Sequence, residues 1–179
     1  ASKLWLLSVA DGSERQIAGL PAPLSLADLA WSPDQRSLAF RREDAASGAN
    51  ELWVVDVAAG QARRLLADVN TSINDELHWL PDSSGLLVQQ QLRDQAAPPA
   101  RDAVPAGPAI QQTSADAGVR AIRTYQDLLR NEADARLFEY YATAQPVIVA
   151  VNGQVRPIAP PGIYLHLSVS PDGRYVLSE

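Results

Sequence analysis

The residues of this chain that could do chemistry are few, and they form no known catalytic pattern. Its two histidines, His78 and His166, each lie ahead of a similar turn. We therefore interpret them as polar positions in the first strands of two repeats, with a metal or catalytic role as the alternative. The sequence contains no Gly-x-Ser-x-Gly elbow, no His-Glu-x-x-His motif and no glycine-rich phosphate loop. Since it also has no cysteine, we predict no catalytic residue, no metal site and no cofactor.

Three aspartates recur in one kind of turn. Asp34, Asp82 and Asp172 each follow a proline directly. Proline presets φ for a turn, and an aspartate side chain can bond the backbone two residues further on. The repetition therefore indicates turn chemistry and not catalysis.

The tryptophans reveal the repeat to which these turns belong. Trp5 and Trp53 are 48 residues apart, and so are Trp31 and Trp79. At these positions we expect them to fill the core between sheets, with a stacking site for a ligand as the alternative. The third turn comes 90 residues after the second, which we explain by an insertion within one repeat.

Four-stranded units of about 40–50 residues are typical of β-propellers. The predicted fold class is mainly β: a partial β-propeller of four-stranded antiparallel blades with a small helical insertion. A β-sandwich with similar hairpins is the alternative. Because propellers close with about 4–8 blades, the chain is expected to be a piece of a longer protein. The expected parts are a half blade at 1–20, a full blade at 27–66, a blade at 75–158 with an insertion at about 93–145, and a half blade at 163–179.

The insertion is the segment that the repeat does not require. Its proline-rich first part, 93–108, predicts a loop without regular structure. Apolar spacing predicts helices over 117–130 and 132–141, the second capped by Asn131. Its polar residues either form a solvated face or contact a substrate. The residues that we select as candidates for substrate binding are Arg120, Arg123 and Tyr125.

Composition narrows the class of partner. The chain has 179 residues, a net charge of −6 and no basic patch interleaved with aromatic residues. Nucleic acid is therefore an unfavourable partner. No run approaches the roughly 20 apolar residues of a membrane span, so we expect no membrane contact.

The motifs of the repeat resemble a known family. Leu-Ala-Trp-Ser-Pro-Asp at 29–34 and Glu-Leu-Trp-Val-Val-Asp at 51–56 resemble the blades of the prolyl oligopeptidase family and of the Tol-system periplasmic propeller. Further motifs are similar to the glutamyl-endopeptidase branch of that family. They are Gly107–Thr113, Arg123–Leu129, Leu137–Thr143 and Pro160–Tyr164.

This resemblance implies a function for a longer protein. Members of the family are serine peptidases with an N-terminal propeller over a C-terminal α/β-hydrolase domain that carries the catalytic residues. The implied partners are that hydrolase domain and a peptide substrate, and the implied role of the propeller is to gate and select substrates. The implied setting is bacterial and periplasmic or secreted. The alternative is a non-enzymatic propeller module for protein binding. The half blades, Lys3–Ile17 and Leu165–Leu177, could also self-associate through their open edges.

Overall fold

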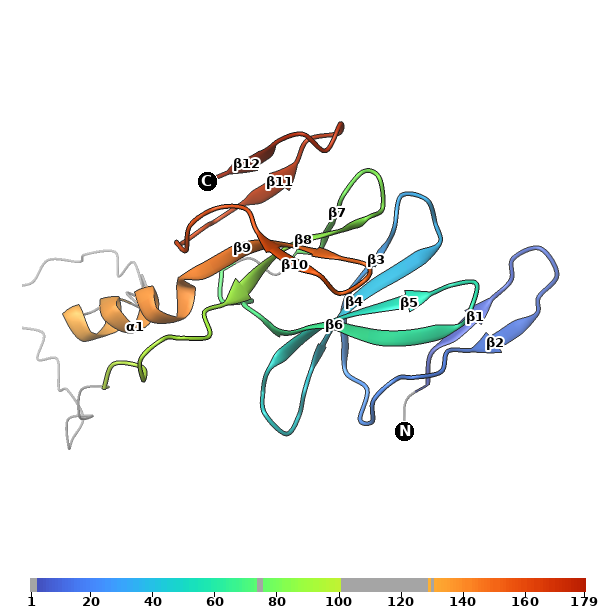
Figure 1. The fold of residues 1–179 in the computed structure, drawn as a ribbon. Helices are drawn as coiled ribbons and strands as arrows, with labels where there is room; N and C mark the ends of the chain where they lie inside the picture. The colour runs from blue at the N-terminus through green and yellow to red at the C-terminus, as the bar shows by residue number, and fades with distance from the viewer. Residues whose placement is uncertain (1–2, 74–75, 101–128, 130) are drawn as a thin grey trace, which may run out of the picture. The chain divides into compact units, whose positions relative to one another are not determined.

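The computed structural model describes residues 3–73, 76–100, 129 and 131–179 (Figure 1). The chain divides into two compact units, one of Ala1–Asp94 with Ala142–Glu179 and the other of Gln95–Tyr141. The described residues form twelve strands and one helix, which confirms the mainly β fold class. Within these residues, no helix is both long and apolar enough to cross a membrane.

Four consecutive strands form the first blade, in which each strand pairs antiparallel with the next (Figure 1). They are β3 (Leu26–Trp31), β4 (Ser37–Glu43), β5 (Asn50–Asp56) and β6 (Gln61–Val69). Gly60 closes the turn between β5 and β6 with φ of 65°, a conformation that glycine adopts without steric cost. The predicted four-stranded antiparallel arrangement is thereby confirmed.

The second blade repeats this order with an insertion in its middle hairpin. Its strands are β7 (His78–Trp79), β8 (Gly85–Gln91), β9 (Ala144–Ala150) and β10 (Val155–Pro157). β8 and β9 pair along seven residues, from Gly85 opposite Ala150 to Gln91 opposite Ala144. The two blades share one pair in register, Val69 with Gln90, so side-chain packing must supply most of their attachment.

Two short hairpins complete this unit. The first hairpin is β1 (Trp5–Leu7) with β2 (Glu14–Gln16), and the last hairpin is β11 (Leu167–Val169) with β12 (Val176–Ser178). Within the described part of the chain, each hairpin is a separate two-stranded sheet.

Apolar side chains that point alternately to the two faces of the strands form two apolar cores. One core joins the two blades and includes Leu52 and Val54 from β5 with Leu86 and Val88 from β8. The other lies between the first blade and the first hairpin, where Phe40 and Val55 pack with side chains that include Leu4 and Leu6. Because successive side chains of a strand point to opposite faces, β5 serves both cores.

The tryptophans divide into two groups, which corrects the prediction that all four fill the core. Trp53 stacks on Phe40 with ring centroids 6.2 Å apart, and Trp79 packs against the core between the blades. Trp5 and Trp31, by contrast, are 49% and 53% exposed. The physical reason is that no strand in the described part of the chain covers these two rings.

In the second unit, the structure describes one helix. α1 (Glu132–Ala142) begins where the sequence predicts, and Asn131 Oδ1 accepts a hydrogen bond of 2.8 Å from the Asp134 backbone N–H. The expected cap is thereby confirmed. The helix predicted over 117–130 lies outside the described residues apart from Leu129.

Candidate functional site

The three residues selected from the sequence, Arg120, Arg123 and Tyr125, all lie outside the described residues. Their assignment to substrate binding stays a prediction. The search for a site in the described part of the chain therefore turns to its cavities and its charged clusters.

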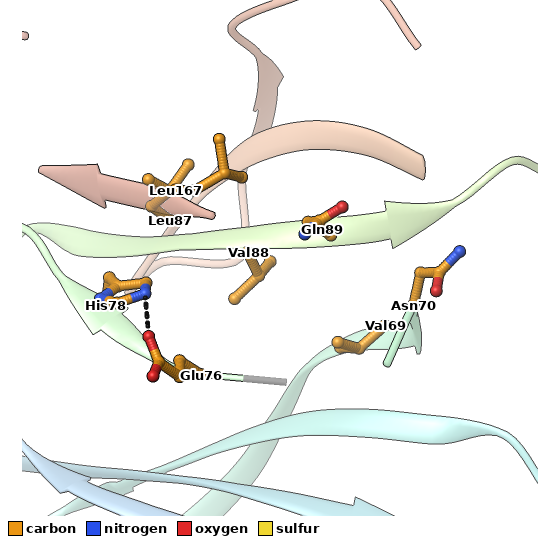
Figure 2. Close-up of a pocket in the computed structure, with 8 residues that line it drawn as sticks. All are labelled: Val69, Asn70, Glu76, His78, Leu87, Val88, Gln89 and Leu167. Atoms are coloured by element: carbon orange, nitrogen blue, oxygen red, sulfur yellow. Dashed lines mark ion pairs between the residues drawn. The ribbon is translucent and has the colours of Figure 1, made fainter. Parts of the chain in front are cut away.

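One cavity lies where the strands β6, β7, β8 and β11 come together (Figure 2). Its volume of about 10 Å³ is room for no more than a water molecule. The lining residues lie on these four strands or directly beside β6 and β7. They are Val69, Asn70, Glu76, His78, Leu87, Val88, Gln89 and Leu167. The cavity is too small to bind a peptide.

The two histidines meet beside this cavity. Their rings are edge to face with centroids 6.4 Å apart, and His78 Nε2 lies 3.2 Å from Glu76 Oε2 (Figure 2). Their positions in the repeat differ, because His78 starts β7 whereas His166 precedes β11. Counted from the following turn, His166 corresponds to Glu76, so the expectation that the histidines occupy comparable places is off by two residues. In the described part of the chain, no three His, Cys, Asp or Glu side chains are grouped to hold a metal ion.

The turn aspartates perform the predicted structural role. Asp34 Oδ1 accepts hydrogen bonds from Ser32 Oγ at 2.6 Å and from the Arg36 N–H at 3.1 Å. Asp172 makes the same two bonds at the same distances, with Ser170 Oγ and the Arg174 N–H. In each turn the serine hydroxyl is the main cause that lowers the pKa of the aspartate.

The middle turn reaches the same result with another residue. Leu80 stands where the other turns have serine, so that hydroxyl is missing. Instead Asp82 Oδ1 accepts from Ser84 Oγ at 2.7 Å and from the Ser84 N–H at 3.0 Å, and the hydroxyl of Ser84 is the first cause of its lowered pKa. These bonds stabilise the turn. Because Asp82 Oδ1 already accepts both of them, we assign the aspartate a structural role and not a catalytic one.

A buried charged cluster occupies one end of the first blade. Glu51 accepts from Arg42 Nη1 and Arg64 Nη1, both at 2.7 Å, and from Trp53 Nε1 at 2.8 Å. Glu51 and Arg42 are only 5% and 4% exposed. Burial alone would raise the pKa of Glu51, but the hydrogen bonds from Arg64, Trp53 and Arg42 outweigh it and the pKa is lowered.

Sequence reasoning missed the charged cluster, although a signal was present. Arg42 and Glu51 follow or precede apolar runs of β4 and β5, and they stand directly opposite each other in the β4–β5 hairpin. Next to the cluster, Arg41 pairs with Asp28 of β3. A carboxylate held by two guanidinium groups and an indole N–H is an acceptor already occupied, so the charged cluster supports structure and not proton transfer.

The charged cluster lies near the loop end of the β4–β5 hairpin. In the second blade, the equivalent end of the β8–β9 hairpin carries the insertion. Glu43 opposite Asn50 ends the β4–β5 pairing, and Gln91 opposite Ala144 ends the β8–β9 pairing. The first blade joins these ends through residues 44–49, whereas the second joins them through 92–143. One hairpin position therefore carries a short loop in one blade and the insertion in the other.

Taken together, the strands and turns define a class of structure, a partial β-propeller. Of the solved structures, a prolyl endopeptidase from a study of inter-domain dynamics in catalysis and specificity matches with a TM-score of 0.55 and 15% identity. The match covers 98% of this chain and 22% of that one, and at this identity it supports the fold alone. TolB from Acinetobacter baumannii matches with a TM-score of 0.49 and 16% identity, over 97% of this chain and 31% of that one. No family model matches the chain.

Similarity in sequence is more specific. The chain is 39% identical over 173 residues to a probable chloroplastic glutamyl endopeptidase of Oryza sativa subsp. japonica. It is 35% identical over 170 residues to the protein of the same name from Arabidopsis thaliana. These matches cover 93% and 92% of the chain but only 18% of each relative. The resemblance to the propeller of the prolyl oligopeptidase family, in its glutamyl-endopeptidase branch, is thereby confirmed. Both relatives are plant proteins, so the expected bacterial source gains no support from them.

Proposed function

We propose that this chain is the non-catalytic propeller part of a serine peptidase, and that it gates and selects peptide substrates for a C-terminal α/β-hydrolase domain. The observation that carries the proposal is the 39% identity to a probable glutamyl endopeptidase over 93% of the chain. That coverage includes the insertion as well as the blades. The catalytic residues are proposed to lie in the hydrolase domain, outside these 179 residues.

The insertion is the part of the chain proposed to select substrates. It is attached at a hairpin that the first blade closes with six residues, 44–49, between Glu43 and Asn50. The repeat alone therefore does not need it, and long insertions on a rigid scaffold commonly carry function. Arg120, Arg123 and Tyr125 remain the residues proposed to contact the peptide.

The test uses the full-length protein and the 179-residue chain side by side. We expect the full-length protein to hydrolyse peptides and the chain alone to be inactive. In the full-length protein, Arg120→Ala and Arg123→Ala should change KM or peptide preference. The matched control is Arg36→Ala, which alters an exposed arginine of a blade turn. Equal kinetics of all three variants would contradict the selecting role, and a full-length protein without peptidase activity would favour a protein-binding module.

The cellular location belongs to the same proposal. The resemblance leads us to expect a periplasmic or secreted protein, whereas the two plant relatives are described as chloroplastic. Fractionation of the source cells, followed by detection of the full-length protein, separates these locations.

A further inference from the structure

We propose that Asp68 and Asn70 of the first blade are positioning residues that hold both ends of the insertion and thereby influence which peptides it selects. Their effect on peptide selection rests on the proposed function, whereas their hold on the two ends does not. Asp68 lies on β6, the fourth strand of the first blade, and Asn70 follows the last residue of that strand, Val69. Neither residue belongs to the blade that carries the insertion.

The end of β6 is the place where the main chains of the two blades meet. Val69 pairs with Gln90 of β8, and the Asn70 N–H donates to the Gln89 carbonyl at 2.8 Å. β8 ends at Gln91, where the insertion begins. Side chains at the end of β6 are therefore within reach of the residues through which the chain leaves the second blade.

Asp68 holds the outgoing end of the insertion, which we define as residues 90–94. Asp68 Oδ1 accepts from Gln90 Nε2 at 3.1 Å, and Asp68 Oδ2 accepts from Arg93 Nε at 2.8 Å. The side chain of Asp68 is only 21% exposed, whereas that of Arg93 is 69% exposed. Hydrogen bonds between ionised groups are stronger than neutral ones, so this carboxylate joins the end of β8 and the start of the insertion to the first blade.

Asn70 holds the returning end, which we define as residues 142–145. Its Nδ2 donates to the Thr143 carbonyl at 3.3 Å, directly before β9 begins at Ala144. Its Oδ1 accepts from the Ser72 N–H at 2.9 Å, a local bond that fixes the orientation of the side-chain amide. Two residues of one short stretch thus hold both ends of one long segment.

The repeat has different residues at the equivalent positions. On the offset of 48 residues, Asp68 corresponds to Leu20 and Asn70 to Ala22. The connection with Leu20 and Ala22 leads into the first blade, whose equivalent hairpin closes with residues 44–49. A carboxylate and an amide therefore stand before the blade that carries the insertion, and apolar side chains stand before the blade that does not.

The short loop of the first blade is closed by its own residues. Asp44 Oδ2 accepts from the Ser47 hydroxyl at 2.7 Å, and the Gly48 N–H donates to the Asp44 carbonyl at 2.7 Å. The insertion is held at its ends by a neighbouring blade instead. Because fixed ends reduce the conformations open to a long segment, contacts between the insertion and a peptide should cost less conformational entropy when both ends are held.

Amide hydrogen exchange of the 179-residue chain tests the two ends separately. Asp68→Leu and Asn70→Ala introduce the residues that the repeat has at the equivalent positions. We expect exchange about fivefold faster at the outgoing end in Asp68→Leu and at the returning end in Asn70→Ala, because each loses hydrogen bonds. Asp68→Glu keeps the carboxylate and should stay close to the parent chain. Arg63→Ala, at an exposed position of β6, is the control and should change neither end.

Further variants cover the case in which one of these fails to fold. Arg93→Ala leaves the first blade intact and should speed exchange at the outgoing end about twofold, since the ion pair is exposed on the side of Arg93. In a chain that already has Asp68→Leu, it should have no further effect. Asn70→Asp keeps the acceptor for Ser72 and removes only the donor to Thr143, so it should act on the returning end alone. Unchanged exchange at both ends in all these variants would overturn the proposal.

Kinetics of the full-length protein test the consequence for substrates. Asp68→Leu combined with Asn70→Ala should raise KM for peptides at least about threefold and leave the hydrolysis of a small ester unchanged, because only the peptide would contact the insertion. Replacement of residues 92–143 by residues 44–49 is measured alongside. If that replacement alters peptide kinetics and the double variant does not, the positioning role is overturned while the proposed function stands. If neither alters them, the selecting role of the insertion is itself contradicted.

Discussion

At the scale of single residues, Glu51 combines deep burial with a full set of charged partners. Its replacement by alanine would leave Arg42 buried with only Asp44, at 3.1 Å, as a carboxylate partner. Breaking a buried pair on one side costs about 3 kcal/mol or more, so we expect Glu51→Ala to lower the free energy of unfolding by about that amount. Arg64 is 53% exposed at its side chain, and Arg64→Ala should cost less than about 1 kcal/mol. Urea unfolding followed by tryptophan fluorescence measures both, and equal losses would contradict this account.

The same carboxylate predicts a dependence on pH. Its pKa in the folded chain is lowered from the ordinary value of 4.5. A carboxyl with a depressed folded pKa contributes stability above its unfolded pKa, and that contribution is lost as the pH falls through the folded pKa. The difference in free energy of unfolding between the parent chain and Glu51→Gln should therefore be constant near neutral pH and shrink below pH 4.5. A difference that grows on acidification would show that the charge opposes folding.

Ser32 offers a second test at this scale, in the turn of the first blade. It is 2% exposed, and its hydroxyl donates to Asp34 while it accepts from the Ser37 N–H at 2.9 Å. Losing buried hydrogen bonds of this kind costs about 1 kcal/mol, which is the loss expected for Ser32→Ala in urea unfolding. Ser170→Ala removes the same two bonds in a turn that is more open to solvent. A loss for Ser170→Ala as large as that for Ser32→Ala would mean that burial does not set the cost.

At the scale of elements, the capped start of α1 carries the next prediction. Asn131 is the cap, and the acidic residues Glu132 and Asp134 lie in the first turn. Their negative charges stabilise the helix by interacting with the positive end of its dipole. Asn131→Ala should destabilise the helix by about 1 kcal/mol, whereas Asn131→Asp should not. Amide hydrogen exchange of residues 135–142 measures the effect. Faster exchange in both variants, or in neither, would argue against a role for the side-chain oxygen.

The elements that sequence predicts best are those set by local chemistry. The strands of the first blade follow from alternation and from turns such as Ser32–Gln35, and α1 follows from Asn131 and apolar spacing. The features that the sequence did not predict depend on which strands lie next to each other and in which register they pair. The charged cluster needs the register of β4 against β5, and the cavity beside His78 needs β6, β7, β8 and β11 brought together. The exposure of Trp5 and Trp31 depends on neighbouring strands, which no local pattern reveals.

At the scale of the whole molecule, repetition explains both the order and the open edges. Each blade buries one face on its neighbour, as the core between β5 and β8 shows, and such stacking gives each unit stability only through the next. The hairpins at either end present the same kinds of strand without a complete blade. The exposed rings and edges of these hairpins are thus a consequence of the repeat, because a strand of this kind is covered only by a neighbouring blade.

The last prediction concerns the insertion as a separable part of this molecule. β8 and β9 pair along seven residues up to Gln91 and Ala144, and the second unit is compact within Gln95–Tyr141. Replacing residues 92–143 by the six residues 44–49 should therefore leave the blades folded, since the first blade closes the equivalent hairpin with that loop. All four tryptophans lie in the unit that remains, so their fluorescence and urea midpoint should stay close to those of the parent chain. In the full-length protein the same replacement should alter peptide selection while hydrolysis of a small ester substrate persists. A variant that unfolds would show instead that the insertion is a structural part of the second blade.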